Sequence, residues 1–444
     1  MSTSRTPRIL SFALTLAAFT FSLAVRAQAQ TETILYNFPG GHTGGLPESG
    51  LTLDSAGNLY GTTSWGGVNA TACDQAGASC GTVYKLTPGM GGTWTETVLH
   101  NFSGDANGGK IFKGIVRDAA GHIYGTASDG GDLSACTGGD YNGQGCGVVF
   151  ELSQNSAGLW KETVLHTFTG GSDGGVPFSD LILDVAGNLY GTTQYGGSPS
   201  ACNGLGCGVV FRLSKTSTGW HETVLRSLNF SQDGQYPTGL VQDSSGNLYG
   251  ATFAGPNYNN CSLGCGTVFR LSPTSSGPWT ETILYTFTNG TDGANPVGSL
   301  ILDSAGNLYG TTEQGGVNSA GTVFKLSPTS SGPWTETQLY IFTGGADGKF
   351  PTSALVFDAA GNLYGSTPYG GNEHTCDTNG CGVVFELSPT TTGPWTESVL
   401  YTFVVGGGQG FNPSGIIRDA AGNLFGTTSD GGSSNLGAVF EVAP

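Results

Sequence analysis

The stretch that decides the fold of this chain reads DSAGNLYGTT and runs from Asp303 to Thr312. Seven versions of it occur along the 444 residues. Successive copies are about 61 residues apart, a period typical of solenoids and β-propellers. We therefore read the chain as seven copies of one structural unit. The leading aspartates of the copies are Asp54, Asp118, Asp184, Asp243, Asp303, Asp358 and Asp419.

One repeat, residues 296–351, predicts four short strands. The first, at 299–303, ends in Asp-x-x-Gly, which has the residue preferences of a type I turn. Strands at 308–312, 321–326 and 334–342 follow, and the last is rich in aromatic and β-branched residues. Four antiparallel strands per repeat is the size of a propeller blade. The 77 glycines fit the same turn-rich, all-β fold.

The two ends of the chain predict how the ring closes. The last repeat stops after its third strand, at 437–442, while residues 31–38 match the fourth strand seen at 280–287. Pairing these two segments removes a free sheet edge, whereas an open solenoid needs atypical capping repeats. We predict a single domain over residues 30–444, an all-β seven-bladed β-propeller whose N-terminal strand completes the last blade.

The N-terminus predicts export. Arg5 and Arg8 precede an apolar run at 9–25, and Ala-Gln-Ala at 27–29 is a small-x-small cleavage site, so residues 1–29 read as a signal peptide. The run is too short for a spanning helix. We therefore expect a periplasmic, secreted or cell-surface protein without membrane insertion. A net charge of −17 repels phosphate backbones, so nucleic acid is not expected as a partner. We expect a monomer.

Ten cysteines lie in the connection between the second and third strands of a repeat, and the two shortest versions of this connection have none. In an exported protein such local pairs indicate disulfides. Zinc is a poor alternative because the spacings vary between pairs and none is Cys-x-x-Cys. The predicted pairs are Cys73–Cys80, Cys136–Cys146, Cys202–Cys207, Cys261–Cys265 and Cys376–Cys381.

Three acidic positions recur in the repeat. The turn aspartates read as turn formers. A glutamate repeats on the outermost strand, where we interpret its charge as a barrier to edge-to-edge association. The third position lies in Gly-x-Asp-Gly before the innermost strand and reads as another turn, with calcium at the channel mouth as the alternative. No other cofactor is expected. The calcium candidates are Asn107, Asp173, Asp233, Asp292 and Asp347.

Binding residues are sought where one copy departs from the others. The position before Gly-Gly, after the second strand, is aromatic in three copies, as Trp65, Tyr195 and Tyr369. On a loop-rich rim these rings stack on sugars or on a partner's side chains, or they pack within their own loops.

Charged departures lie on the innermost strand. Asp180 replaces a small residue, while Arg117 and Arg418 stand before turn aspartates. Near an apolar channel these three side chains anchor a ligand, or they form a solvated lining. Glycoside cleavage needs two facing carboxyl groups, and only Asp180 is placed near the channel, so no catalytic residue is assigned beyond that single candidate.

Two longer phrases, GLxxDxxGNLYGTT and LYxFTGGxDG, resemble the Gloeo/Verruco (GloVer) tandem repeat over residues 31–444. The family, described as choice-of-anchor GloVer-repeat proteins of bacteria, implies an exported or surface protein and no known activity. Its members often carry a C-terminal anchor, whereas this chain ends at Pro444 within the last repeat, which favours a periplasmic or released protein.

Two functions stay open from the sequence. We expect an exported binding or interaction module whose loop-rich, disulfide-braced face holds a glycan or protein ligand. The alternative is an extracellular hydrolase or lyase that acts on polysaccharides at the channel mouth near Asp180.

Overall fold

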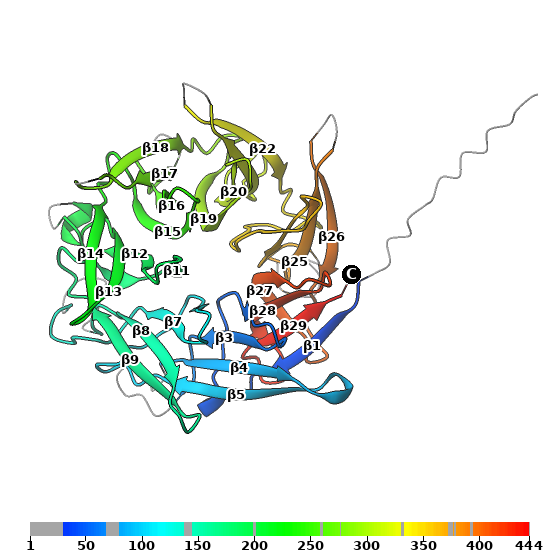
Figure 1. The fold of residues 1–444 in the computed structure, drawn as a ribbon. Helices are drawn as coiled ribbons and strands as arrows, with labels where there is room; N and C mark the ends of the chain where they lie inside the picture. The colour runs from blue at the N-terminus through cyan, green and yellow to red at the C-terminus, as the bar shows by residue number, and fades with distance from the viewer. Residues whose placement is uncertain are drawn as a thin grey trace, which may run out of the picture.

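Seven small antiparallel sheets stand in a ring, in sequence order from blue to red (Figure 1). The structure is a computed structural model. It describes residues 30–67, 80–136, 144–198, 201–257, 261–275, 277–329, 333–371, 376, 379–390 and 394–443. Within these ranges no residue is in an α-helix, and no helix is long and apolar enough to cross a bilayer. The prediction of an all-β seven-bladed propeller is confirmed.

Each blade begins with its innermost strand (Figure 1). Blades 1 and 2 comprise β2 (Thr52–Leu53), β3 (Leu59–Thr63), β4 (Thr82–Pro88), β5 (Trp94–Asn101), β6 (Val116–Arg117), β7 (Ile123–Ala127), β8 (Val148–Gln154) and β9 (Trp160–Thr167). Blades 3 and 4 comprise β10 (Gly175–Pro177), β11 (Ile182–Leu183), β12 (Leu189–Tyr195), β13 (Val209–Thr216), β14 (Gly219–Ser227), β15 (Gln235–Gln242), β16 (Leu248–Ala254), β17 (Thr267–Ser272) and β18 (Thr280–Thr286).

The remaining blades repeat the same order. Blades 5 and 6 comprise β19 (Ala294–Leu302), β20 (Leu308–Gln314), β21 (Thr322–Ser327), β22 (Thr335–Ile341), β23 (Val356–Phe357), β24 (Leu363–Thr367), β25 (Val383–Ser388) and β26 (Thr396–Thr402). Blade 7 comprises β27 (Gly410–Arg418), β28 (Leu424–Gly431), β29 (Ala438–Val442) and β1 (Glu32–Asn37). Loops hold the short 3₁₀ helices η1 (Gly41–Thr43), η2 (Met90–Gly92) and η4 (Cys202–Gly204).

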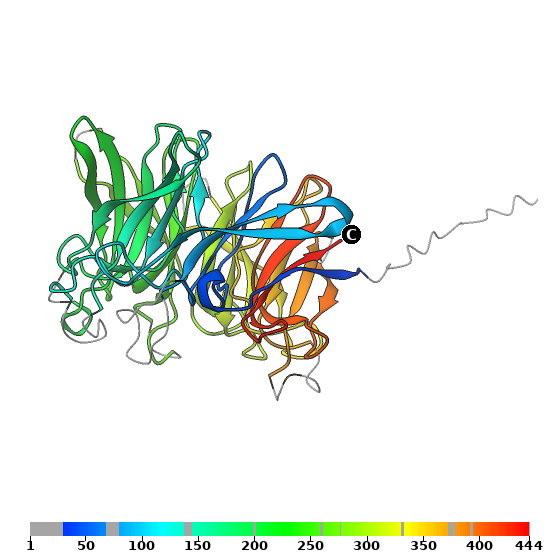
Figure 2. The same ribbon diagram turned by 90° about the horizontal axis from the view of Figure 1, so that it is seen from below.

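The ring closes through the N-terminal strand, as predicted. β1 pairs antiparallel with β29, from Glu32 opposite Val442 to Asn37 opposite Ala438. The backbone N–H of Phe38 then donates to the carbonyl of Gly437, the bond that follows the outermost strand in the other blades too. Figure 2 shows the ring from its edge, with the strand connections gathered on two opposite faces.

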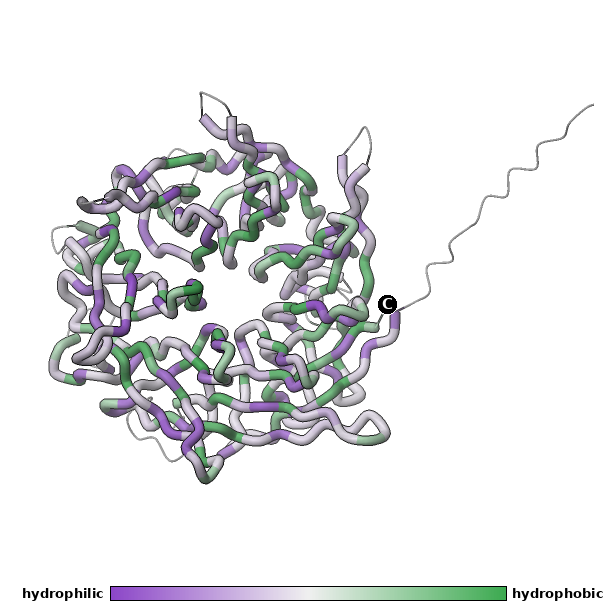
Figure 3. Tube along the Cα trace, viewed as in Figure 1, coloured by the Kyte–Doolittle hydropathy of each residue, from purple (hydrophilic) through white to green (hydrophobic). Residues whose placement is uncertain are grey.

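The hydrophobic core lies between the blades, and apolar residues accordingly occur all around the ring (Figure 3). Phe287, at the end of one blade, packs edge-on against Phe324 of the next, with ring centroids 5.1 Å apart. Phe324 also covers Gly310 of its own blade, where a Cβ atom would come within 2.7 Å of the ring. Equivalent ring pairs are Phe38–Tyr84, Phe102–Phe150, Phe168–Phe211, Phe342–Phe385 and Phe403–Phe440.

Each DxxGNLY phrase is one hydrogen-bonded turn. Asp303 Oδ1 accepts the backbone N–H groups of Ala305 and Asn307, at 2.9 and 2.8 Å. Its Oδ2 accepts from Asn307 Nδ2 at 2.7 Å and from the Tyr309 hydroxyl at 3.0 Å. Burial alone raises the pKa of Asp303, but these hydrogen bonds outweigh it and lower the pKa. The interpretation of the repeated aspartates as turn formers is confirmed.

The interpretation of the repeated glutamates as edge charges is wrong. Each glutamate is half-buried, and outermost strands of neighbouring blades contact one another, as β5 does with β1 and with β9. The Tyr36 hydroxyl donates to Glu96 at 2.8 Å, and Arg226 lies 2.6 Å from Glu281. The seven residues are Glu32, Glu96, Glu162, Glu222, Glu281, Glu336 and Glu397.

We predict that Asp303→Ala lowers the free energy of unfolding by about 2 kcal/mol, because the turn loses four hydrogen bonds and leaves their donors without an acceptor. Urea denaturation measures the change. Ser304→Ala, at the exposed next position, is the control and should unfold as the unchanged protein does. Equal stability of the two variants would contradict the role of the turn.

Candidate functional site

Disulfides brace the loops of one face. Four of the predicted pairs are formed, with Cα atoms 5.2 to 5.5 Å apart: Cys136–Cys146, Cys202–Cys207, Cys261–Cys265 and Cys376–Cys381. In the fifth pair, Cys73 lies outside the described residues and Cys80 is buried. Local disulfides form in oxidising compartments, which agrees with an exported protein.

On the same face each blade begins with a non-glycine residue in the left-handed region, which costs about 1 kcal/mol or more. Their φ values lie between 53° and 58°, and six of the seven precede proline. The backbone N–H of such a residue donates to a carbonyl of the preceding blade, as from Lys110 to Cys80 at 2.8 Å. Packing of the blades therefore holds this backbone in place. The residues are Leu46, Lys110, Val176, Tyr236, Asn295, Phe350 and Asn412.

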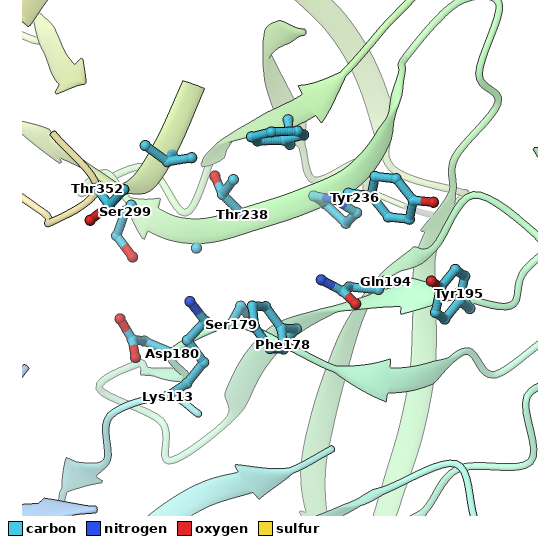
Figure 4. A pocket seen from close by; sticks show the side chains of 15 residues that line it. Lys113, Phe178, Ser179, Asp180, Gln194, Tyr195, Tyr236, Thr238, Ser299 and Thr352 are labelled. Atoms are coloured by element: carbon cyan, nitrogen blue, oxygen red, sulfur yellow. The ribbon is translucent and has the colours of Figure 1, made fainter. Parts of the chain in front are cut away.

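An aromatic cavity of about 460 Å³ opens between blades 3, 4 and 5. Figure 4 shows Phe178, Gln194 and Tyr195 of blade 3 on one side, and Tyr236 of blade 4 on the other. Phe253 of blade 4 is the remaining aromatic residue of the lining. The rings of Tyr195 and Tyr236 meet edge-on, with centroids 5.8 Å apart. We call this cavity the aromatic lobe.

One end of the aromatic lobe is polar and charged (Figure 4). The Lys113 ammonium lies 4.4 Å from the centre of the Phe178 ring. Asp180 Oδ1 accepts the backbone N–H of Gly114 at 2.7 Å. Burial lowers the pKa of Lys113, and the carboxylates of Asp180 and Glu48 counteract part of this shift. A cation and an anion thus stand together beside the aromatic wall.

A second cavity of about 300 Å³ continues along the channel and shares Lys113 and Asp180 with the first. It adds Glu48, Tyr369 and Asp430 to the lining, so we call it the acidic lobe. Asp430 accepts hydrogen bonds from Asn412 Nδ2 at 2.9 Å and from the Ser429 hydroxyl at 3.0 Å. Burial is the largest cause that raises the pKa of Glu48, while Lys113 lowers it. The two lobes differ in charge and meet at Lys113 and Asp180.

The three predicted aromatic residues do not form one site. Tyr195 lines the aromatic lobe and Tyr369 the acidic lobe. Tyr369 packs edge-on against Phe350, with ring centroids 6.2 Å apart. Trp65 lines neither lobe and packs instead against Gly40 and Gly45, as the loop-packing alternative requires.

The structure does not bring the predicted arginines to Asp180. The Arg117 guanidinium lies 4.1 Å from the centre of the Tyr60 ring and 3.7 Å from Asp54 of the preceding blade's turn. Arg418 lies over Tyr364 in the same way, at 5.6 Å. Both arginines therefore join neighbouring blades at the DxxGNLY turns, and the three-residue anchor is not formed.

The calcium candidates lie beside the outermost strands rather than at the channel mouth. Asp292 accepts four hydrogen bonds, from the Tyr285 hydroxyl, from the N–H and hydroxyl of Thr288, and from the N–H of Gly290. N–H and O–H groups that point at a carboxylate occupy the positions a cation would take. This donor set fits the turn interpretation. No three metal-binding side chains cluster in the described part of the chain.

Sequence reasoning missed most of the aromatic lobe. Tyr236 is itself the left-handed residue at the entry to its blade, and Phe178 follows the left-handed Val176 by two residues, which the sequence pattern does not reveal. Lys113 left a detectable signal, because the equivalent positions of blades 1 and 3 hold Ser49 and Ser179. The comparison of copies that found Asp180 would have found Lys113 as well.

Comparisons with known proteins add a family and a fold. The sequence profile of the Gloeobacter/Verrucomicrobia repeat matches residues 18–204, 70–277 and 259–444. No curated protein matches the chain.

Solved structures that resemble the chain are distant. One is a proposed 6-phosphogluconolactonase from Bacteroides uniformis, 14% identical over 84% of this chain and 89% of that chain, with a TM-score of 0.47. A gluconolactonase from Xanthomonas campestris is 15% identical over 67% of this chain and 82% of that one, with a TM-score of 0.37. The extracellular domain of a proposed hybrid two-component system from B. thetaiotaomicron is 11% identical over 92% of this chain and 39% of that one, at 0.49. Likeness at this level says nothing about what this chain binds or does.

We predict that Asp180→Asn lowers the pKa of Lys113 further, because burial then acts with less opposition from a neighbouring carboxylate. Glu48→Gln should lower it by a smaller amount, since Asp180 is the larger influence. NMR titration of reductively ¹³C-methylated lysines measures the shift. Asp105→Asn, an exposed change outside both lobes, is the control. An unchanged Lys113 titration in Asp180→Asn would contradict the assigned electrostatics.

Proposed function

The chain belongs to the Gloeobacter/Verrucomicrobia repeat family, and we propose that this member is an exported binding module that holds a glycan in its aromatic lobe. The observation that carries the proposal is the convergence of aromatic and polar side chains on one cavity of about 460 Å³. This volume lies within the usual range of small-molecule sites, roughly 300 to 1,000 Å³.

The lining suits a sugar ring in both its apolar and its polar parts. The C–H face of a sugar packs on aromatic rings, which Phe178, Tyr195 and Tyr236 supply from two walls. Sugar hydroxyls both donate and accept, and the amide of Gln194 does the same. At the charged end the Lys113 ammonium offers donors and the Asp180 carboxylate offers acceptors. A neutral sugar with several hydroxyls matches this pair better than a strongly charged ligand does.

A glycan fits this geometry better than a protein ligand does. A stable protein partner contacts a broad surface, about 800 Å² on each side. The polar groups here converge instead on a concave space that admits one or a few sugar rings. A protein partner could still bind the surrounding disulfide-braced loops. That would be a separate proposal, for which the channel residues give no argument.

Cleavage of the glycan is less well supported than its binding. Two carboxyl groups on opposite sides of the scissile bond carry out glycoside hydrolysis. Among the residues that line the aromatic lobe, Asp180 is the single carboxylate. Glu48 and Asp430 belong to the acidic lobe, away from the aromatic wall. The lobe therefore holds a sugar without the paired carboxylates that would cut it.

We expect Tyr195→Ala combined with Tyr236→Ala to weaken glycan binding by about tenfold or more, because both stacking rings are lost. Isothermal titration of the mature protein against soluble oligosaccharides and polysaccharides gives the affinities. New reducing ends, measured in the same samples, report any cleavage.

Matched controls are Trp65→Ala, which removes an aromatic side chain outside both lobes, and Tyr369→Ala, which removes one from the acidic lobe. Both should bind as the unchanged protein does. Unchanged affinity in the double variant would place the ligand elsewhere, and new chain ends that disappear in Asp180→Asn would favour the hydrolase.

A further inference from the structure

Carboxyl groups of neighbouring blades meet at the outer rim of the ring. At four interfaces the Gly-x-Asp-Gly aspartate that follows one blade raises the pKa of the repeated glutamate of the next blade, and at one of them Arg226 lies 2.6 Å from both carboxylates. Residues far from the channel thus place two acids side by side, which neither the turns nor the binding site requires. The four pairs are Asp173 with Glu222, Asp233 with Glu281, Asp292 with Glu336, and Asp347 with Glu397.

A third side chain, from the outermost strand of the earlier blade, stands at each pair. Arg226 Nη2 lies 2.6 Å from Asp233 and 2.6 Å from Glu281, so one guanidinium joins both acids. Tyr285 and Tyr340 each donate a hydrogen bond to the aspartate, both at 3.1 Å. At the remaining pair His166 lies 3.5 Å from Asp173. At the two tyrosine interfaces no ion pair with a Lys, Arg or His side chain forms among the described residues.

The two acids of a pair differ in their hydrogen bonds. The aspartate is well supplied with donors, since Asp347 accepts from Tyr340 and from both the N–H and the hydroxyl of Thr343. The glutamate has a buried oxygen, Oε1, without any partner, and this holds at Glu336 and Glu397 as at the other repeated positions. A buried carboxylate oxygen without a donor is costly, whereas a protonated carboxyl group supplies its own donor.

Electrostatics agrees with a proton on the glutamate. Burial, with a smaller contribution from the facing aspartate, raises the pKa of Glu336 and of Glu397 to about 7. Burial and Asp173 raise the pKa of Glu222 to about 7 against the opposing effect of His166. At Glu281 burial and Asp233 outweigh Arg226, and the pKa rises to about 8.

We propose that each of these four pairs holds one proton on its glutamate, so that the outer rim carries interblade clasps that close in acid and weaken as the solution becomes alkaline. The neutral glutamate joins the facing carboxylate without the repulsion that two charged carboxylates at one interface would suffer. The ring is thereby suited to a mildly acidic environment.

The direction of the pH effect follows from the two states of the glutamate. Its ordinary value is 4.5, and the folded protein raises it to about 7. The folded state therefore binds more protons than the unfolded chain between these values, and stability falls as pH rises through this range. The contribution is complete below 4.5 and lost above about 8, the value at Glu281. The turn aspartates act oppositely and only in stronger acid, below their ordinary 3.8.

A calcium ion is a poor occupant of these pairs. The donors that surround Asp292 and Asp347 would have to turn away before either carboxylate bound a cation. At the Asp233 pair the Arg226 guanidinium already takes the position of a positive charge.

The first test uses calorimetric melting of the mature protein from pH 4.5 to about pH 8, with and without calcium. The melting temperature should fall across this range and should not respond to calcium. In Glu336→Gln combined with Glu397→Gln the fall should be clearly smaller, because an amide mimics the protonated acid at every pH. Asp105→Asn, an exposed change at a residue outside the four pairs, is the control and should keep the full fall. An equal fall in the double variant, or a calcium-induced rise, would overturn the proposal.

Infrared titration of the unchanged protein tests the same point without any variant. A neutral-carboxyl C=O band should persist near pH 6, between the ordinary value of 4.5 and the raised value of about 7, and vanish above about 8. A protein without that band near pH 6 would hold no shared protons, and the clasps would not exist.

Discussion

One aromatic contact between neighbouring blades supports the rest of the structure. The ring of Phe324 lies between Phe287 of the preceding blade and Gly310 of its own blade. A single side chain therefore sets both the distance between two blades and the distance between two strands of one blade. A side chain at position 310 would push this ring aside, because its Cβ would come within 2.7 Å. Phe38, directly after the N-terminal strand β1, makes the same contact with Tyr84. The ring of blades therefore closes with the same aromatic contact that joins its other neighbouring blades.

Rigid packing of the blades allows strained backbone at the entry to each of them. A left-handed residue before proline is disfavoured when isolated, yet it recurs around the ring because a carbonyl of the preceding blade accepts its N–H. This backbone turns Tyr236 towards Tyr195 and Phe350 towards Tyr369. The scaffold is sevenfold, whereas the side chains it presents differ from blade to blade. The residues of the proposed binding site lie where the copies differ.

Features set by neighbouring residues could be predicted from the sequence. The turn at Asp303 needs only the side chains of Asn307 and Tyr309, and closure of the ring needs only a missing strand at one end of the chain. Features set by contacts between blades could not be predicted from the sequence. The sequence predicted Arg117 near the channel, but its guanidinium packs on Tyr60 of the neighbouring blade. The sequence predicted Glu336 on an exposed edge, but one of its carboxylate oxygens is buried. A repeat pattern shows which positions are equivalent, but not what faces them across an interface.

The channel and the rim carry different kinds of variation for a physical reason. At the rim a blade packs along its neighbour, so a changed side chain needs a partner, as Arg226 has in Asp233 and Glu281. At the channel the innermost strands line open space, and single departures such as Lys113 and Asp180 disturb no aromatic contact of the core. A charged pair can therefore arise there without weakening the ring. The glutamates with a raised pKa lie on outermost strands, whereas Lys113 and Asp180 line the channel, so the proposed pH response of the fold is separable from the proposed choice of ligand.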